Sequence, residues 1–285
     1  MPLGANQVTV TTANVFRPNV WSQEALRARE SNLVLVPLVK HYDREIASKG
    51  QTVEIPNVSN LTANLKVANT QVTLNSPTET KTTVTINQHY ECSVLIEDIV
   101  DAQSAYDLAQ EYTAKVGYAL AEKMDYFVAS KLNAGGTYTI GQYGAVLNDQ
   151  VILAANRYLD DAKAPQTDRA LVVTPQGKQE MLNIDKYIRY DAIGKSGTDN
   201  SIANGQIGEI YGVRVYMSQN LVVTAATPTQ NNHLFFHKEA LALAVQKDVK
   251  FASQRKEEYL GTLYVGQALW GGSILRADHI VTIKS

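Results

Sequence analysis

The fold of this chain is organised around residues 96–136, which read IEDIVDAQSAYDLAQEYTAKVGYALAEKMDYFVASKLNAGG. Apolar side chains recur there at the spacing of one helix face, at Leu108, Tyr112, Val116, Leu120, Met124, Phe127, Val128 and Leu132. Two glycines then give a stop signal at 135–136. The pattern predicts a helix over residues 104–133, about 45 Å long at about 1.5 Å per residue. Because the mean globular helix has only about 11–12 residues, we expect a strut across a flattened molecule.

The composition is that of an ordinary globular protein, and it argues against several functional classes. The chain has 285 residues, a formal net charge of −2 and a single cysteine, Cys92. The near-zero charge argues against tight binding of nucleic acid or of an anionic membrane, and a lone cysteine excludes an internal disulfide. No apolar run approaches the about 20 residues of a membrane span, and the first residues lack the pattern of a signal peptide. We therefore expect a soluble protein that stays in a reducing cytoplasm.

A threonine-rich segment precedes the long helix. Between residues 51 and 88, apolar and polar side chains alternate at the period of a strand, as at Val53 and Ile55 and again at Val84 and Ile86. The sequence NSPT at 75–78 is a turn signal, so a long two-stranded hairpin is predicted. It has too few apolar residues for a core of its own, and an isolated hairpin is marginal in water. It must therefore fold back on the body or lie on a neighbouring molecule.

The N-terminal part divides into an arm and a helical section. Residues 1–20 are polar and poorly periodic, which is typical of an extended arm. Trp21 opens a helical apolar pattern that continues to Val39. Pro37 interrupts this pattern, so two short helices or one kinked helix are expected.

The C-terminal half alternates between strands and helices. Asn148 and Thr174 are predicted N-caps of two helices, with a buried strand at 170–173 between them. Further strand patterns follow in three segments: two strands about a glycine at 207–216, a strand or a helix at 234–245, and two strands at 263–283 with a turn at 271–273. Together with the hairpin and the long helix, this order predicts an α+β fold.

No constellation of catalytic residues is recognisable. The sequence GKS at 194–196 imitates the end of a phosphate-binding loop, but Arg189 stands where that motif needs a glycine. His233 and His237 could share a helix face as metal ligands, yet the residues between them fit a strand equally well. We therefore expect no catalytic, metal-binding or cofactor-binding residue and no enzymatic activity. An enzyme with a polar hairpin lid stays an alternative, because active-site residues can be distributed along a chain.

The order of these parts resembles the major capsid protein of tailed bacteriophages, which has the HK-ninety-seven-type fold. Residues 50–56 (GQTVEIP) resemble the family's entry into its E-loop, residues 96–104 resemble the start of its spine helix, and Asp125 resembles an acid late in that helix. Residues 208–218 (GEIYGVRVYMS) are similar to paired strands of its A-domain, and residues 274–283 resemble the closing strands of its P-domain. Ala277 departs from the pattern, since a proline is common at that position.

The resemblance implies a division of the α+β fold into an N-terminal arm, an extended β-hairpin called the E-loop, a long spine helix, a P-domain and an A-domain. The expected boundaries are 1–48 for the N-terminal arm and helix, 49–90 for the E-loop hairpin, 91–143 for the P-domain with the spine helix, 144–243 for the A-domain and 244–285 for the closing strands of the P-domain.

The resemblance also implies a structural function. The chain would assemble with itself, as hexamers and pentamers, into an icosahedral head shell that encloses the double-stranded DNA of a phage. It would be made in the bacterial host cytoplasm, reside in the virion capsid, and need a portal and a separate scaffolding protein but no cofactor. Packaged DNA would be touched only weakly and no membrane would be bound. A shell of an encapsulin-like nanocompartment is the alternative.

Five residues are candidates for contacts between subunits: Trp21, Lys66, Lys81, Arg189 and Lys195. Some members of the family cross-link their subunits through a lysine and an asparagine. Lys66 and Lys81 lie in the predicted hairpin, but no local pattern identifies a partner for a cross-link, so we interpret them as ordinary surface lysines.

Overall fold

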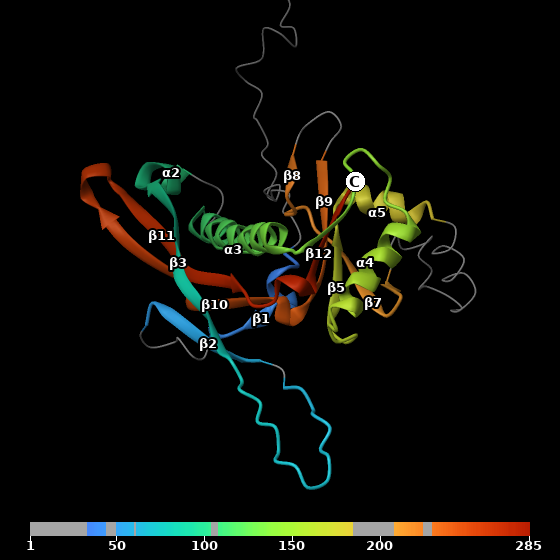
Figure 1. Ribbon diagram of the computed structural model, residues 1–285. Coiled ribbons are helices and arrows are strands. Elements are labelled where there is room, and N and C mark those ends of the chain that lie inside the picture. Colours follow the sequence, from blue (N-terminus) through green and yellow to red (C-terminus); the bar gives the residue numbers. More distant parts are fainter. Residues whose placement is uncertain (1–32, 44–49, 60, 104–107, 185–207, 225–229) are drawn as a thin grey trace, which may run out of the picture.

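The predicted long helix is present as α3 (Leu108–Gly135), which runs through the middle of the molecule (Figure 1). The computed structural model describes residues 33–43, 50–59, 61–103, 108–184, 208–224 and 230–285. The large apolar side chains on the buried face of α3 are Val116, Leu120, Met124, Val128 and Leu132. Tyr112 belongs to the predicted stripe but is 44% exposed, so among the described side chains the buried stripe begins at Val116.

A five-stranded sheet supports one side of α3. Its strands lie in the order β1 (Lys40–His41), β10 (Leu241–Lys256), β11 (Gly261–Ile274), β3 (Glu79–Glu97) and β2 (Thr52–Val58). Helix α3 packs on β11, where a Cβ atom added at Gly266 would lie 2.5 Å from Val116 Cγ1. The missing side chain of Gly266 therefore lets the helix lie directly on the sheet. The far end of the sheet carries α2 (Asp98–Gln103), which follows β3, and the short helix η4 (Glu257–Tyr259) between β10 and β11.

A seven-stranded sheet forms the other half of the fold. Six strands lie in the order β4 (Tyr138–Gly141), β12 (Ile280–Lys284), β9 (Gln230–His237), β5 (Arg169–Val173), β7 (Val213–Met217) and β6 (Glu209–Ile210), and β8 (Val223–Thr224) pairs with β9. Helices α4 (Asp149–Asp161) and α5 (Pro175–Leu182) lie beside this sheet (Figure 1). The predicted caps are confirmed, because Val151 N donates to Asn148 Oδ1 and Gly177 N donates to Thr174 Oγ1.

The core is divided by this second sheet. Along β5 and β9, Leu171 and Phe235 join the cluster formed with α4 and α5, whereas Val172 and Phe236 join the cluster around α3. Strands buried on both faces read as continuous apolar runs, which is why the strand at 170–173 was predictable. The ambiguous segment 234–245 resolves into the end of β9, the short helix η3 (Lys238–Ala240) and the start of β10.

The hairpin is present, but its predicted turn at 75–78 is wrong. Strands β2 and β3 pair antiparallel from Thr52–Thr85 to Val58–Glu79. The chain between them, residues 59 and 61–78, is an irregular loop that turns at residues 68–70. Asn69 adopts a φ of 63° at this turn, a left-handed conformation that asparagine tolerates better than most residues. We call residues 59 and 61–78 the hairpin loop.

Two further local predictions are corrected. Strand β11 continues through the predicted turn at 271–273, because a Cβ at Gly271 would lie 2.2 Å from the carbonyl oxygen of Thr85. This glycine therefore serves the close approach of β3 rather than a turn, and the chain turns later, through the short helix η5 (Ala277–His279). The helical pattern predicted up to Val39 is only partly right, because its described part, residues 33–39, contains just the short helix η2 (Val36–Leu38) at Pro37. Strand β1, paired with β10, follows it directly. The predictions for residues 1–32, including Trp21, lie outside the described residues.

Candidate assembly interface

The hairpin loop extends away from both sheets (Figure 1). Its apolar side chains are largely in solvent, with Leu65 93% and Leu74 88% exposed. Leu61, Val67 and Val72 are exposed as well. So many exposed apolar side chains on one projecting segment are uncommon on a soluble monomer and indicate a site of association. The sequence predicted that this segment could not bury itself, and its exposure in the single chain confirms that prediction.

Hydrogen bonds between its two sides keep the hairpin loop closed. Asn64 Nδ2 donates to Asn75 Oδ1 over 3.1 Å, and Asn75 Nδ2 donates to the carbonyl oxygen of Thr62 over 2.6 Å. At its base, Thr78 N donates to Ser59 Oγ over 3.0 Å. The loop therefore presents its apolar side chains from a partly ordered backbone, which lowers the conformational entropy lost when it docks.

The structure places two of the five contact candidates. Lys66 Nζ lies at the tip of the hairpin loop, where it donates to the carbonyl oxygens of Val67 and Thr70. Lys81 Nζ lies 2.7 Å from Glu54 Oε1 across the base of the hairpin. Both lysines thus have partners within their own chain, and their role between subunits stays a prediction. Trp21, Arg189 and Lys195 lie outside the described residues.

A second exposed apolar surface lies at the far end of the five-stranded sheet and was missed by the sequence analysis. It consists of Ile99 and Val100 on α2 and of Tyr259 and Leu260 after β10, each at least half exposed. We call these four residues the tip patch. Local periodicity could not reveal it, because its two halves are about 160 residues apart in the sequence and meet only through sheet pairing.

An ion pair orders the backbone beneath the tip patch. Arg255 donates to both carboxylate oxygens of Asp98, with 2.6 Å between Nη2 and Oδ2. This bond holds the pKa of Asp98 below its usual range. Asp98 N also donates to the carbonyl oxygen of Leu260 over 3.0 Å. The two halves of the patch are therefore joined by a side-chain contact and a main-chain contact.

A buried carboxylate joins three distant parts of the chain. Asp125 on α3 accepts hydrogen bonds from Leu35 N at 2.7 Å, Val36 N at 3.2 Å and Asn220 Nδ2 at 3.0 Å. It is fully buried, so these three donors take the place of water around its carboxyl oxygens. Asp125 therefore attaches residues 33–43, which we call the N-terminal segment, and the loop after β7 to the long helix.

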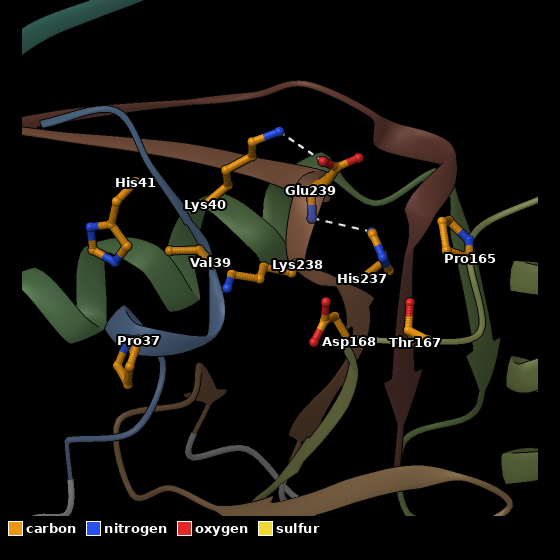
Figure 2. Close-up of a pocket in the computed structure, with 10 residues that line it drawn as sticks. All are labelled: Pro37, Val39, Lys40, His41, Pro165, Thr167, Asp168, His237, Lys238 and Glu239. Atoms are coloured by element: carbon orange, nitrogen blue, oxygen red, sulfur yellow. Dashed lines mark hydrogen bonds and ion pairs between the residues drawn. The ribbon is translucent and has the colours of Figure 1, made fainter. Parts of the chain in front are cut away.

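A surface pocket of about 590 Å³ separates the N-terminal segment from the connections of the seven-stranded sheet (Figure 2). It is lined by Pro37, Val39, Lys40, His41, Pro165, Thr167, Asp168, His237, Lys238 and Glu239. Lys40 Nζ lies 2.7 Å from Glu239 Oε1, and this bond raises the pKa of Lys40 and lowers that of Glu239. Both groups are therefore held in their charged forms, which makes neither of them a ready general acid or base near neutral pH.

The two histidines that raised the possibility of a metal site do not share a helix. They belong to strand β9, and their ring nitrogens have other partners. His233 Nδ1 accepts from Thr174 N at 3.2 Å, and its Nε2 lies 2.9 Å from Ser285 Oγ. His237 Nδ1 accepts from Glu239 N at 3.2 Å. Among the described residues no group of three or more histidine, cysteine, aspartate or glutamate side chains could hold a metal ion.

The described helices include none long and apolar enough to cross a membrane.

Comparison with protein families gives a match to the model of a phage capsid protein family over residues 41–284. The chain belongs to this phage capsid protein family. No curated protein matches it.

Solved structures of phage capsids share the fold of this capsid protein. A chain from Mycobacterium phage Che8 superposes with a TM-score of 0.81 at 26% identity, covering 94% of this chain and 97% of the other. The head of Helicobacter pylori bacteriophage KHP40 gives a TM-score of 0.79 at 11% identity, covering 99% of each chain. The capsid of cyanophage P-SCSP1u gives 0.77 at 21% identity, covering 99% of this chain and 96% of the other. The HK-ninety-seven-type α+β fold is thereby confirmed.

Family and fold together define the role of the chain. It is a structural major capsid protein, a component of the virion that acts within a multimeric shell. The encapsulin-like alternative is not favoured, because the family and the compared structures are those of phage capsids. The exposed hairpin loop and tip patch are accordingly the surfaces where contacts between copies are to be sought.

Proposed function

We propose that this protein assembles with itself, as hexamers and pentamers, into the icosahedral shell of a phage head that encloses double-stranded DNA. The observation that carries the proposal is the hairpin loop, which extends away from both sheets (Figure 1) and whose apolar side chains are exposed in the single chain. A closed shell needs repeated contacts between different surfaces of identical subunits. Long elements that reach over a neighbour supply such contacts.

The proposal includes the division of the chain and the circumstances of assembly. Residues 49–90 act as the E-loop, 91–143 and 244–285 as the P-domain, 144–243 as the A-domain, and 1–48 as the N-terminal arm and helix. Assembly takes place in the bacterial cytoplasm with a separate scaffolding protein and a portal. We assign no enzymatic activity, and Lys66 and Lys81 remain candidates for contacts around the loop.

The loop docks through its apolar side chains in this proposal. Leu65 and Leu74 are almost fully exposed, and burying a leucine side chain stabilises a complex by about 1.5–3 kcal/mol. The hydrogen bonds across the loop reduce the entropy lost on docking. The loop is therefore an assembly element that adds little to the stability of its own subunit.

The test is a loop deletion that respects the observed hairpin. Ser59 and Thr78 are already hydrogen-bonded, so residues 60–77 can be replaced by a two-residue Asn-Gly turn, which suits the twist of an antiparallel pair. The deletion variant should remain a folded subunit with an unchanged unfolding midpoint, and it should form no shells. Sedimentation and negative-stain microscopy are compared under the conditions in which the wild-type chain assembles.

Point variants distinguish the effect of the apolar side chains on assembly from the effect of the loop's length. Leu65→Ser combined with Leu74→Ser should reduce assembly while subunit stability stays within about 0.5 kcal/mol of wild type, because both positions are exposed. Leu65→Met with Leu74→Met is the matched control, since methionine retains the apolar surface, and it should assemble normally. Normal shells from the deletion variant would refute the role of the loop.

A further inference from the structure

The chain passes directly from one sheet to the other at two crossings that pack against each other. The first crossing is η3, between β9 and β10, and the second contains η5, between β11 and β12. Leu275 N and Arg276 N, in the second crossing, donate to the carbonyl oxygen of Ala240 in the first, over 2.8 and 3.2 Å. Any change in the angle between the two sheets must therefore alter these crossings.

A pair of buried histidines lies where the crossings meet. His237 ends β9 and His279 ends η5, and their rings meet edge to face with centroids 5.8 Å apart and planes at 89°. Both side chains are buried. The ring of His237 also caps η3, because its Nδ1 accepts from Glu239 N. That bond requires Nδ1 to carry no proton, so an imidazolium at His237 would lose the cap.

The charged groups around the pair come from every adjoining element. Glu239 and Asp168 favour a positive charge on His237, whereas Arg169 and His279 itself oppose it. Next to His279, Asp278 and Glu239 favour a positive charge and Arg276 opposes it. Two of these neighbours are already paired, Glu239 with Lys40 and Arg169 with Asp160, and Lys238 adds a further positive charge beside the pocket.

Burial decides the balance at both rings. Burial has the largest effect on the pKa of each histidine, and it lowers the pKa of His237 and of His279 below the usual value of 6.5. A positive charge on one ring also disfavours a charge on the other. At neutral pH both rings are therefore uncharged. When acid protonates one ring, the positive charge lies in a buried site that disfavours it.

We propose that His237 and His279 form a proton-sensitive latch between the two sheets of this protein. With both rings neutral, the edge-to-face contact and the cap on η3 hold the crossings together. A proton taken up from solvent at His237 Nδ1 removes the acceptor of the Glu239 N–H and places a charge against His279, and a proton on His279 acts on the same contact. Either event loosens the crossings and allows the angle between the sheets to change.

Hydrogen–deuterium exchange of the full-length, unassembled chain tests this latch. Exchange is measured at about pH 7.5 and about pH 5.5, a range that spans the ordinary histidine pKa, and is corrected for the intrinsic effect of pH. Peptides covering 238–243 and 275–281 should lose protection at the lower pH, because the opened crossings bind a proton more readily than the closed ones. Peptides covering β5, within the seven-stranded sheet, should not.

Two variants identify the groups responsible. His237→Asn keeps a side-chain oxygen that can cap η3 but cannot be charged, and His279→Gln removes the second ring while keeping a hydrogen-bond donor. Each should lose less protection at the lower pH than the wild-type chain, because only one of the two titrating rings remains in each variant. His89→Gln is the matched control, because His89 is exposed on β3, and it should behave as wild type.

Three results would overturn the proposal: equal protection of the crossings at the two pH values, a wild-type loss of protection in both variants, or a loss spread evenly over the whole chain. His233 does not complicate the test, because burial lowers its pKa to about 4. That value lies below the range of pH used. The measurement is made on single subunits, so its outcome does not depend on whether the chain forms shells.

Discussion

At the scale of single residues, we expect substitution of Asp125 to reduce the stability of the subunit strongly. Asp125 is fully buried and accepts hydrogen bonds from three donors in two distant segments. Asp125→Ala should lower the free energy of unfolding by about 3 kcal/mol or more, since each buried donor left without a partner costs about 1–3 kcal/mol. Urea unfolding of unassembled subunits measures this difference.

The matched control is Asp161→Ala. Asp161 is also an aspartate on a helix, but it is exposed and pairs with Arg157 one turn away at 3.7 Å. Exposed pairs at this spacing contribute only about 0.3–0.5 kcal/mol. Equal unfolding midpoints for the two variants would contradict the anchoring role of Asp125.

His233 should make the stability of the subunit depend on pH. Burial lowers its pKa from 6.5 to about 4 in the folded chain, so the unfolded chain binds more protons between these values. The contribution is complete above pH 6.5 and is lost as the pH falls toward 4, by about 3 kcal/mol in all. His233→Gln should therefore show a shallower fall of unfolding free energy with acid than wild type. Parallel pH profiles for the two proteins, measured by urea unfolding, would contradict this assignment.

At the scale of elements, α3 is stabilised by one face. Leu120 is buried against the five-stranded sheet, next to the contact of Val116 with Gly266. Leu120→Ala should lower the free energy of unfolding by about 2–5 kcal/mol, a large part of the about 5–15 kcal/mol of a typical domain. Its folding yield should fall before the geometry of any assembly changes.

Lys123→Ala is the control for this helix, because Lys123 lies on the exposed side of α3. It should stay within about 0.5 kcal/mol of wild type. Glu122, by contrast, is half-buried and has a partner, so it would be a poorer control. If urea unfolding gave Leu120→Ala and Lys123→Ala the same midpoint, α3 would not be the strut of the subunit.

At the scale of the whole molecule, the low net charge predicts weak contact with DNA. With a formal net charge of −2, the protein has no overall excess of positive charge to attract phosphates. Non-specific binding by DNA-binding proteins has Kd values of about 10⁻⁴–10⁻⁶ M at physiological salt, and we expect this protein at the weak end or beyond. Fluorescence anisotropy with a labelled duplex and assembled protein measures the affinity. A nanomolar Kd would contradict the prediction.

The sequence by itself determined the features that depend on close neighbours in the chain. The apolar period of α3, the caps at Asn148 and Thr174 and the paired strands around Gly212 were all predictable. Each arises from residues within a few positions of one another, where helix geometry and backbone hydrogen bonds act directly. The same local reasoning showed that the hairpin lacked a core of its own. It thereby also identified the hairpin loop, the more exposed of the two candidate interfaces.

Only the tertiary structure decided which of these elements meet. The tip patch joins α2 to the turn after β10. Asp125 binds segments about 90 residues away on either side. Gly271 lies inside a strand, where Thr85 approaches it closely. The same holds for the edge contact between His237 and His279. Periodicity and capping describe a residue's neighbours along the chain, whereas burial and close approach depend on packing between residues far apart in sequence, which no local pattern encodes.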